Sequence, residues 1–174
     1  MVRGTFSPAR AWRPAVVARL ARTLGLTQDP SMPVTGSQAL IIGAFLSAAA
    51  ALAHLACIGL GPQAYRFMGA GEKMARAVEA GKIRPTLTTL AISQVLLVWS
   101  AYALGAAGVI QLLPFSSLVL PAVCAVYLGR AVAFPLLRPA FPENSIKFWL
   151  VSSGICLVIG LVHVYGVLSV WPAL

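Results

Sequence analysis

Four polar side chains lie inside long apolar stretches of this sequence and are the first candidates for chemistry. They are His54, Gln94, Tyr127 and Arg130. A polar or ionisable side chain is costly to place at membrane depth, which makes it a functional candidate by default. We counted about 1.5 Å per helical residue from the ends of those stretches. All four residues then lie about 9 to 15 Å from the same membrane face, the one that carries residues 61–85. The sequence therefore predicts one polar layer that contains all four.

Arg130 is the most informative of the four. None of the four carboxylates in the sequence lies in an apolar stretch where it could pair with this residue. Its guanidinium could extend to the lipid headgroups, as long basic side chains do. Alternatively, it binds an anionic ligand, a lipid phosphate or a quinone carbonyl in a pocket with the other three residues. The same lack of carboxylates argues against an ion-coupled transporter and denies a hydrolase its acid and base groups.

The histidines and cysteines do not predict a cofactor. His163 comes out about 22 Å from that side, about 13 Å deeper than His54, so it is expected outside the polar layer and too far away to share a haem iron. His54 and Cys57 share a helical face and could form half of a soft-metal site with Cys156. Isolated residues of these types usually pack and hydrogen-bond in apolar helices, and we expect neither a metal nor another cofactor.

Composition indicates a protein that folds in lipid. Of its 174 residues, 59% are hydrophobic and 10% are charged, whereas a soluble domain has about 25% charged residues. The net charge of +9 comes from basic residues at the ends of the apolar stretches. Because no stripe of basic and aromatic residues accompanies them, we expect the lipid bilayer as the partner and no nucleic acid.

Four apolar stretches are long enough to cross a membrane, for which a helix needs about 20 residues. They cover residues 39–60, 86–104, 115–137 and 148–170. Pro121 should kink the third span, and Trp149 and Trp171 should anchor the two ends of the fourth at the membrane surface. The predicted fold is all-α, a four-helix transmembrane bundle over residues 38–174.

Residues 61–85 form the only long charged segment between the apolar stretches. A short helix is predicted at 71–80, with Gly81 as its C-terminal stop. In the third loop, residues 138–147, Asn144 or Ser145 can cap the last helix. Candidates for interactions of the first loop are Tyr65, Arg66, Glu72 and Arg76.

The basic residues of the first and third loops predict the sidedness of the chain. Positive charge near the ends of membrane spans favours the cytoplasmic side. We therefore expect a bacterial inner membrane protein with loops 61–85 and 138–147 in the cytoplasm. The alternative is an organellar inner membrane, after removal of a transit peptide.

Residues 1–37 are a basic extension of a different character. Between Pro14 and Leu24, apolar residues fall on one side of a helix, which predicts about three turns of amphipathic helix in the membrane interface. A flexible basic tail, an organellar transit peptide and an extension upstream of a start at Met32 are the open alternatives.

Three short motifs resemble small four-helix membrane proteins of bacteria: Ala64-Tyr65-Arg66, Gly69-Ala70-Gly71-Glu72 and Gly160-Leu161-Val162-His163. The resemblance covers about residues 38–170 and implies no activity. We expect a non-enzymatic accessory factor or complex subunit that acts through helix packing and its basic loop, as a homo-oligomer or with a membrane partner. A protein that binds anionic lipid or quinone around Arg130, with or without enzyme activity, is the alternative. A small-molecule transporter is third.

Overall fold

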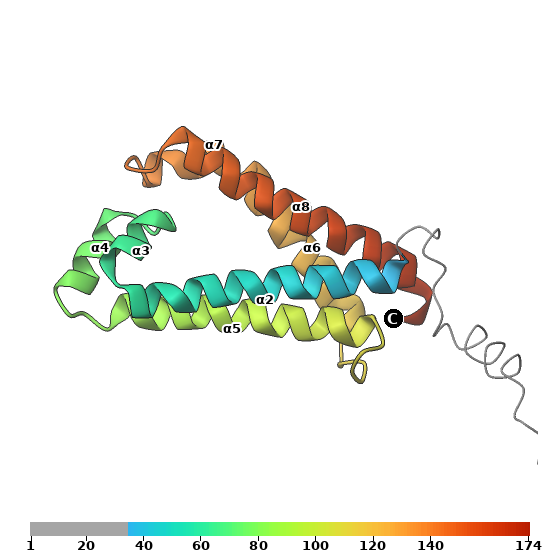
Figure 1. The fold of residues 1–174 in the computed structure, drawn as a ribbon. Helices are drawn as coiled ribbons and strands as arrows, with labels where there is room; N and C mark the ends of the chain where they lie inside the picture. Colours follow the sequence, from blue (N-terminus) through green and yellow to red (C-terminus); the bar gives the residue numbers. More distant parts are fainter. Residues whose placement is uncertain (1–34) are drawn as a thin grey trace, which may run out of the picture. The chain divides into compact units, whose positions relative to one another are not determined.

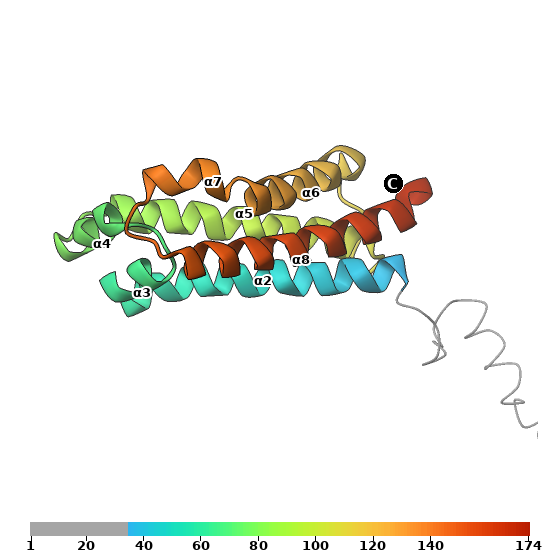
Figure 2. The same cartoon turned by 90° about the horizontal axis from the view of Figure 1, so that it is seen from above.

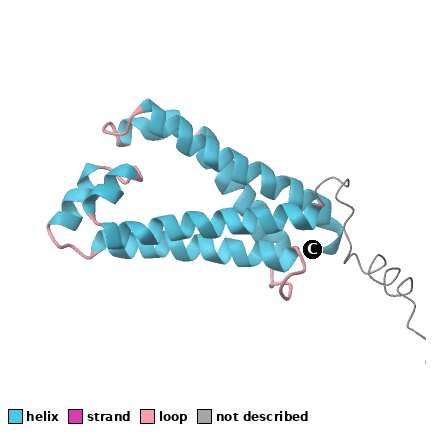
Figure 3. Cartoon of the chain, in the orientation of Figure 1, coloured by secondary structure: helices cyan, strands magenta, loops and turns pink. Residues whose placement is uncertain are grey.

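The computed structural model describes residues 35–174, which belong to one compact unit of the chain beginning at Val34. In this part of the chain every regular element is helical (Figures 1 and 3). The helices are α2 (Gly36–Leu60), α3 (Pro62–Phe67), α4 (Glu72–Glu79), α5 (Arg84–Ala106), α6 (Ser116–Val132), α7 (Phe134–Leu137) and α8 (Ile146–Val170), with 3₁₀ turns η1 (Arg138–Ala140) and η2 (Trp171–Ala173). The all-helical class is thus confirmed for these residues.

Three helices of the described part are long and apolar enough to cross a membrane: α2, α5, and α8 with its continuation to Ala173. The segment that follows α5 makes a fourth crossing only if two pieces count as one, because α6 and the stretch Phe134–Ala140 meet at an angle of 63°. The span predicted over 115–137 is therefore not one continuous helix, and a bundle of four crossings is not confirmed.

Pro135 gives the physical reason for this bend. A proline inside a helix has no N–H to donate, and its ring collides with the carbonyl four residues earlier, here that of Ala131. The helix stops accordingly at Val132 and restarts at Phe134, with Pro135 in its first turn. Helix α6 runs without interruption through Pro121, the proline expected to distort it.

The long helices pack as two pairs. Helix α2 lies along α5, and α6 lies along α8 (Figures 1 and 2). The two pairs meet where α2 begins and α8 ends, and α2 and α8 diverge toward their other ends (Figure 1). Glycines allow α2 and α8 to pack closely where they meet. A Cβ on Gly36 would overlap Ser169, and one on Gly166 would come within 2.6 Å of Leu40. Small residues let helix backbones approach each other in this way.

Helices α3 and α4 form a hairpin in the first loop. The predicted helix over 71–80 is observed as α4, and Gly81 ends it as expected. Gly81 has φ +66° and donates to the Val78 carbonyl at 2.9 Å, while Lys82 donates to Ala77 at 2.9 Å. This pair of bonds is the Schellman arrangement, which favours glycine because a side chain at positive φ is strained.

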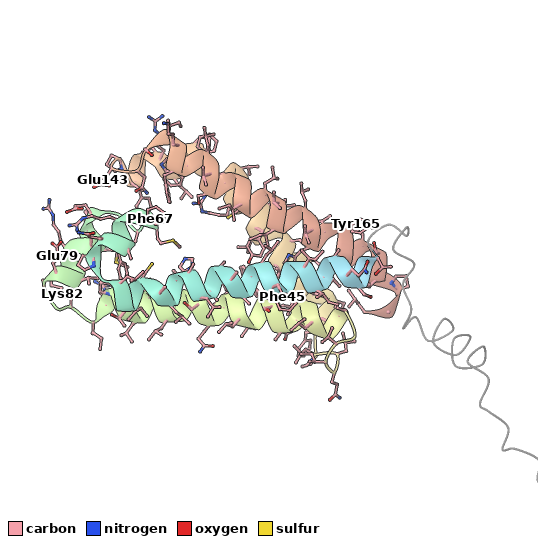
Figure 4. All side chains as sticks on the ribbon, viewed as in Figure 1. Phe45, Phe67, Glu79, Lys82, Glu143 and Tyr165 are labelled. Atoms are coloured by element: carbon pink, nitrogen blue, oxygen red, sulfur yellow. The ribbon has the colours of Figure 1, made fainter. Side chains whose placement is uncertain are left out.

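The first and third loops lie at the same end of the described helices, as Glu79, Lys82 and Glu143 show in Figure 4. Ser145 caps α8, because its hydroxyl accepts a hydrogen bond from the N–H of Phe148 at 3.1 Å. Asn144, the other predicted cap, instead donates its side-chain amide to the carbonyl of Gly69 at 3.0 Å. The third loop is thereby tied to the hairpin of the first.

Helix α2 begins three residues earlier than expected. Thr35 and Gln38 each accept a hydrogen bond from the other's backbone N–H, at 3.3 and 2.8 Å. This reciprocal capping box fixes the start at Gly36. The amphipathic helix predicted between Pro14 and Leu24 lies outside the described residues.

Candidate functional site

Tyr127 of α6 lies in a buried cluster to which α2, α5 and α8 each contribute a side chain. Its hydroxyl is 2.9 Å from the Ser47 hydroxyl of α2, and the two share a hydrogen bond. Its ring stacks on that of His163 with centroids 5.5 Å apart and meets Trp99 edge-on at 5.3 Å. His163 is completely buried. Its Nδ1 lies 2.9 Å from the carbonyl of Ile159, and since a carbonyl only accepts, this nitrogen carries the proton.

The expected separation of His163 from Tyr127 is therefore wrong. Helix side chains lean toward the N-terminus of their own helix. Helices α6 and α8 run in opposite directions, so Tyr127 and His163 lean toward each other. A depth count along the backbone ignores this lean, and two long aromatic side chains close a difference of about 7 Å.

The other members of the predicted layer are placed differently. His54 is half-buried, and its Nδ1 donates to the carbonyl of Ala50 in the preceding turn at 2.8 Å. It shares a face of α2 with Ser47, seven residues earlier. Gln94 is exposed on the outer face of α5, next to the buried Ser93. The structure thus brings Tyr127 to His163 and Ser47, and it does not bring Gln94 into that cluster.

Arg130 lies in the last turn of α6, just before the bend. Its side chain runs along α8 rather than away from the protein. One terminal nitrogen donates to the hydroxyl of Ser152 at 3.0 Å, and the guanidinium carbon lies 5.3 Å from the centre of the Trp149 ring. Trp149 is only 2% exposed, so it is buried beside Arg130 and is not the lipid-facing anchor that was expected.

Several buried polar atoms around Arg130 have no hydrogen-bond partner within residues 35–174. They are Nη1 of Arg130, Nε1 of Trp149 and Oγ of Ser153. Trp149, Ser152 and Ser153 stand three and four residues apart on α8, so they share one face of that helix. Arginine and tryptophan nitrogens can only donate. An unpaired buried donor is costly, and these atoms are suited to a ligand that brings acceptor oxygens.

The charged candidates of the first loop are joined to one another. Arg66 binds Glu72 at 2.9 Å and Glu79 at 2.8 Å, and Arg76 binds Glu72 at 3.0 Å. Hydrogen bonds from Arg66, and then from Arg76, lower the pKa of the Glu72 carboxyl to about 2. The same bonds to Glu72 and Glu79 raise the pKa of Arg66.

Tyr65, the fourth loop candidate, is 2% exposed and faces inward. Its hydroxyl is hydrogen-bonded to that of Thr89 on α5, with the oxygens 3.1 Å apart. Tyr65 also packs with Cys57 and Ala75 in a small core beneath the hairpin. It therefore attaches the hairpin to α2 and α5 rather than presenting a surface.

No group of three or more His, Cys, Asp or Glu side chains in the described part of the chain is arranged to hold a metal ion. All three cysteines are free thiols. His54 and Cys57 thus gain no third ligand from Cys156.

Sequence reasoning missed the neutral residues that surround the predicted ones. Ser47 sits in a run of alanines, and Trp149 was interpreted as a surface anchor. The spacing of Trp149, Ser152 and Ser153 did carry a signal, because it puts an indole and two hydroxyls on one helical face. The spacing did not indicate which helix would pack against this face.

No family model matches this chain, and the searches of curated proteins and of solved structures give no match either. The fold and the site therefore define only a class. The described residues form a helical protein with three helices able to cross a membrane, or four with the bent pair. At one end of these helices a half-buried arginine lies against a buried tryptophan and has no carboxylate partner among residues 35–174.

Proposed function

We propose that this chain is an integral membrane protein that binds an anionic amphiphile at Arg130. In this proposal α6 and α7 together make a fourth crossing, and the first and third loops face the cytoplasm of a bacterium. The observation that carries the proposal is the buried Nη1 of Arg130, which has no partner among the described residues. The hydrogen bond between Asn144 and Gly69 supports placing the two loops on one side.

The chemistry of the site favours an oxygen-rich ligand. A guanidinium presents a planar fork of donors that matches two oxygens of a phosphate or carboxylate. The Trp149 ring stabilises the cation through its face, a contact worth about 2 kcal/mol when water is excluded. Ser152 uses one terminal nitrogen of the guanidinium, which leaves Nη1 for the ligand. A lipid phosphate and a quinone carbonyl both offer the acceptor, and the phosphate adds the compensating charge.

Native mass spectrometry of protein taken from vesicles of phosphatidylcholine with phosphatidylglycerol tests this proposal. We expect wild-type protein to retain phosphatidylglycerol and Arg130→Ala to lose it. Arg130→Lys should retain it weakly, because an ammonium keeps the charge but not the planar fork. Retention of a quinone in place of the lipid, also lost in Arg130→Ala, would identify the carbonyl ligand.

Arg138→Ala is the matched control, since Arg138 is an exposed arginine of the third loop at the same end of the protein. It should retain as much phosphatidylglycerol as the wild type. Equal retention in Arg130→Ala and Arg138→Ala would reject the site. Trp149→Phe should weaken retention less than Arg130→Ala does, because phenylalanine still offers a ring face.

A second candidate function, that of an accessory factor or complex subunit, is favoured by a different observation. An open groove of about 400 Å³ lies between α2 and α8, lined by Leu46, Val151, Gly154, Ile155, Val158 and Ile159. A Cβ on Gly154 would meet nothing within 4 Å. Gly154 thus leaves room in this open apolar surface for another helix to pack closely in lipid.

Purification in mild detergent tests this second candidate. An oligomer or a complex is expected, and Gly154→Leu should release the partner by filling the groove. Gly129→Leu is the control, because Gly129 on α6 is equally open but lies outside the groove. A lone monomer with no co-purifying protein would count against this function.

A further inference from the structure

The hairpin of α3 and α4 touches the beginning of α8 through bare glycine backbone. Gly69 has φ +72°, and a Cβ there would overlap the ring of Phe148. Gly71 has φ +87°, and its Cβ would come within 3.0 Å of Phe141. The Asn144 amide donates to the Gly69 carbonyl at 3.0 Å. We call this contact between Gly69 and Gly71 on one side and Phe141, Asn144 and Phe148 on the other the seam.

The seam is directly connected to the proposed binding site. The rings of Phe148 and Phe141 lie 5.8 and 6.4 Å from that of Trp149, centroid to centroid. Trp149 in turn lies under the guanidinium of Arg130, at 5.3 Å. The hairpin is therefore separated from Arg130 by two aromatic layers, and a shift of the Phe148 ring changes the packing of Trp149.

The hairpin stays fixed to the other pair of helices. The hydroxyl of Tyr65 is hydrogen-bonded to that of Thr89 of α5, and Tyr65 packs on Cys57 of α2. Two ion pairs of Arg66 hold α3 and α4 together. Against these attachments, the seam has one hydrogen bond and the contacts of the two phenylalanine rings. It is consequently the place where the two pairs of helices separate most easily at this end.

We propose that the seam is the gate of the Arg130 site, through which the anionic headgroup passes from the loop side. Closed, the hairpin covers Phe148 and Trp149 and holds the indole under the guanidinium. Open, it exposes both rings and the unpaired donors of Arg130. This inference rests on the proposed function. Its test distinguishes a failure of the gate from a failure of lipid binding at Arg130.

Gly69→Ala is the decisive variant, since its methyl group enters the space of the Phe148 ring. Gly81→Ala is its matched control: both glycines have positive φ and end a helix of the hairpin, but a Cβ on Gly81 meets nothing within 4 Å. Both variants strain the backbone in the same way, so a difference between them reports the seam. We expect about tenfold more open form in Gly69→Ala than in Gly81→Ala, as one overpacked methyl group produces.

Two readouts are measured on the full chain. The first is iodide quenching of Trp149 fluorescence in a background with Trp12, Trp99 and Trp171 changed to phenylalanine, without added lipid. The second is the rate at which bound phosphatidylglycerol exchanges with vesicles. The quenching and the exchange rate should both rise in Gly69→Ala. In Gly81→Ala both should stay at or close to the wild-type level.

Phe148→Ala opens the seam without a clash and gives the same prediction if Gly69→Ala folds poorly. Quenching that does not exceed that of Gly81→Ala in either variant would overturn the gate. Increased quenching with unchanged lipid exchange would also overturn it, because the headgroup would then reach Arg130 by another route. Retention of the lipid by Arg130→Ala would instead contradict the proposed function. The proposed role of the gate would then be contradicted as well.

Discussion

Gly43 of α2 lies flat against the imidazole ring of His163 of α8. A Cβ added to this glycine would come within 2.7 Å of the ring carbon Cε1 and 2.9 Å of Nδ1. His163 cannot move away easily, because Tyr127 stacks on it and its Nδ1 is held by the carbonyl of Ile159. The contact is thus a fixed point in the packing of α2 against α8.

Gly43→Ala should therefore destabilise the protein, although alanine is the better helix former by about 0.5–1 kcal/mol. The overpacked methyl group costs about 1–3 kcal/mol, and the melting temperature in detergent should fall. Gly59→Ala is the control within α2, because a Cβ there meets nothing within 4 Å. It should leave the melting temperature unchanged or raise it. Equal shifts in both variants would show that Gly43 and His163 are not in contact.

The hydrogen bond between Ser47 and Tyr127 should couple α2 to α6. A double-mutant cycle of Ser47→Ala and Tyr127→Phe measures the coupling directly, because it cancels the effect of each change by itself. Interhelical hydrogen bonds in membranes contribute about 0.6 kcal/mol on average. We expect a coupling energy of this size in the free energy of unfolding in detergent. Additive effects of the two substitutions would contradict the bond.

Acid should loosen the α3–α4 hairpin only at low pH. The pKa of Glu72 is lowered from 4.5 to about 2 in the folded protein. A carboxyl with a depressed pKa stabilises the fold above its unfolded pKa, and that contribution is lost as the pH falls through the folded value. Hydrogen exchange of the α4 amides, corrected for intrinsic rates, should thus stay slow above pH 4.5 and accelerate toward pH 2.

Glu72→Gln tests the cause of this pH dependence. The variant should already show faster exchange at neutral pH, and its exchange should change little over the acid range. Glu143→Gln, in the exposed third loop, is the control and should keep the wild-type profile. An unchanged profile in Glu72→Gln would mean that the ion pairs with Arg66 and Arg76 do not hold the hairpin.

Single cysteines should report four crossings. In a background without Cys57, Cys124 and Cys156, we expect Lys82→Cys and Glu143→Cys to react with an impermeant thiol reagent from one side of the membrane. Gln111→Cys, in the exposed connection between α5 and α6, should react from the other side. If α6 and α7 instead re-enter and leave on the same face, Glu143→Cys will react together with Gln111→Cys.

Much of the fold follows from the sequence alone. Hydropathy located α2, α5 and α8 to within a few residues, because about 20 apolar residues are what a hydrocarbon core requires of a helix. Gly81 and Ser145 marked helix ends through local backbone and capping chemistry, which neighbouring residues suffice to specify. The absence of Asp and Glu from the apolar stretches, and hence from the stretch that holds Arg130, was equally a property of the sequence.

Only the tertiary structure decided which polar residues meet. Depth along separate helices left His163 apart from Tyr127, whereas antiparallel packing stacks their rings at 5.5 Å. The same packing turned Trp149 from a surface anchor into the buried partner of Arg130 and left Gln94 on the outer face of α5. The physical reason is that hydropathy specifies how far along a helix a residue lies. The direction in which a side chain points depends on how each helix is rotated and tilted against its neighbours, and contacts between distant residues fix that rotation.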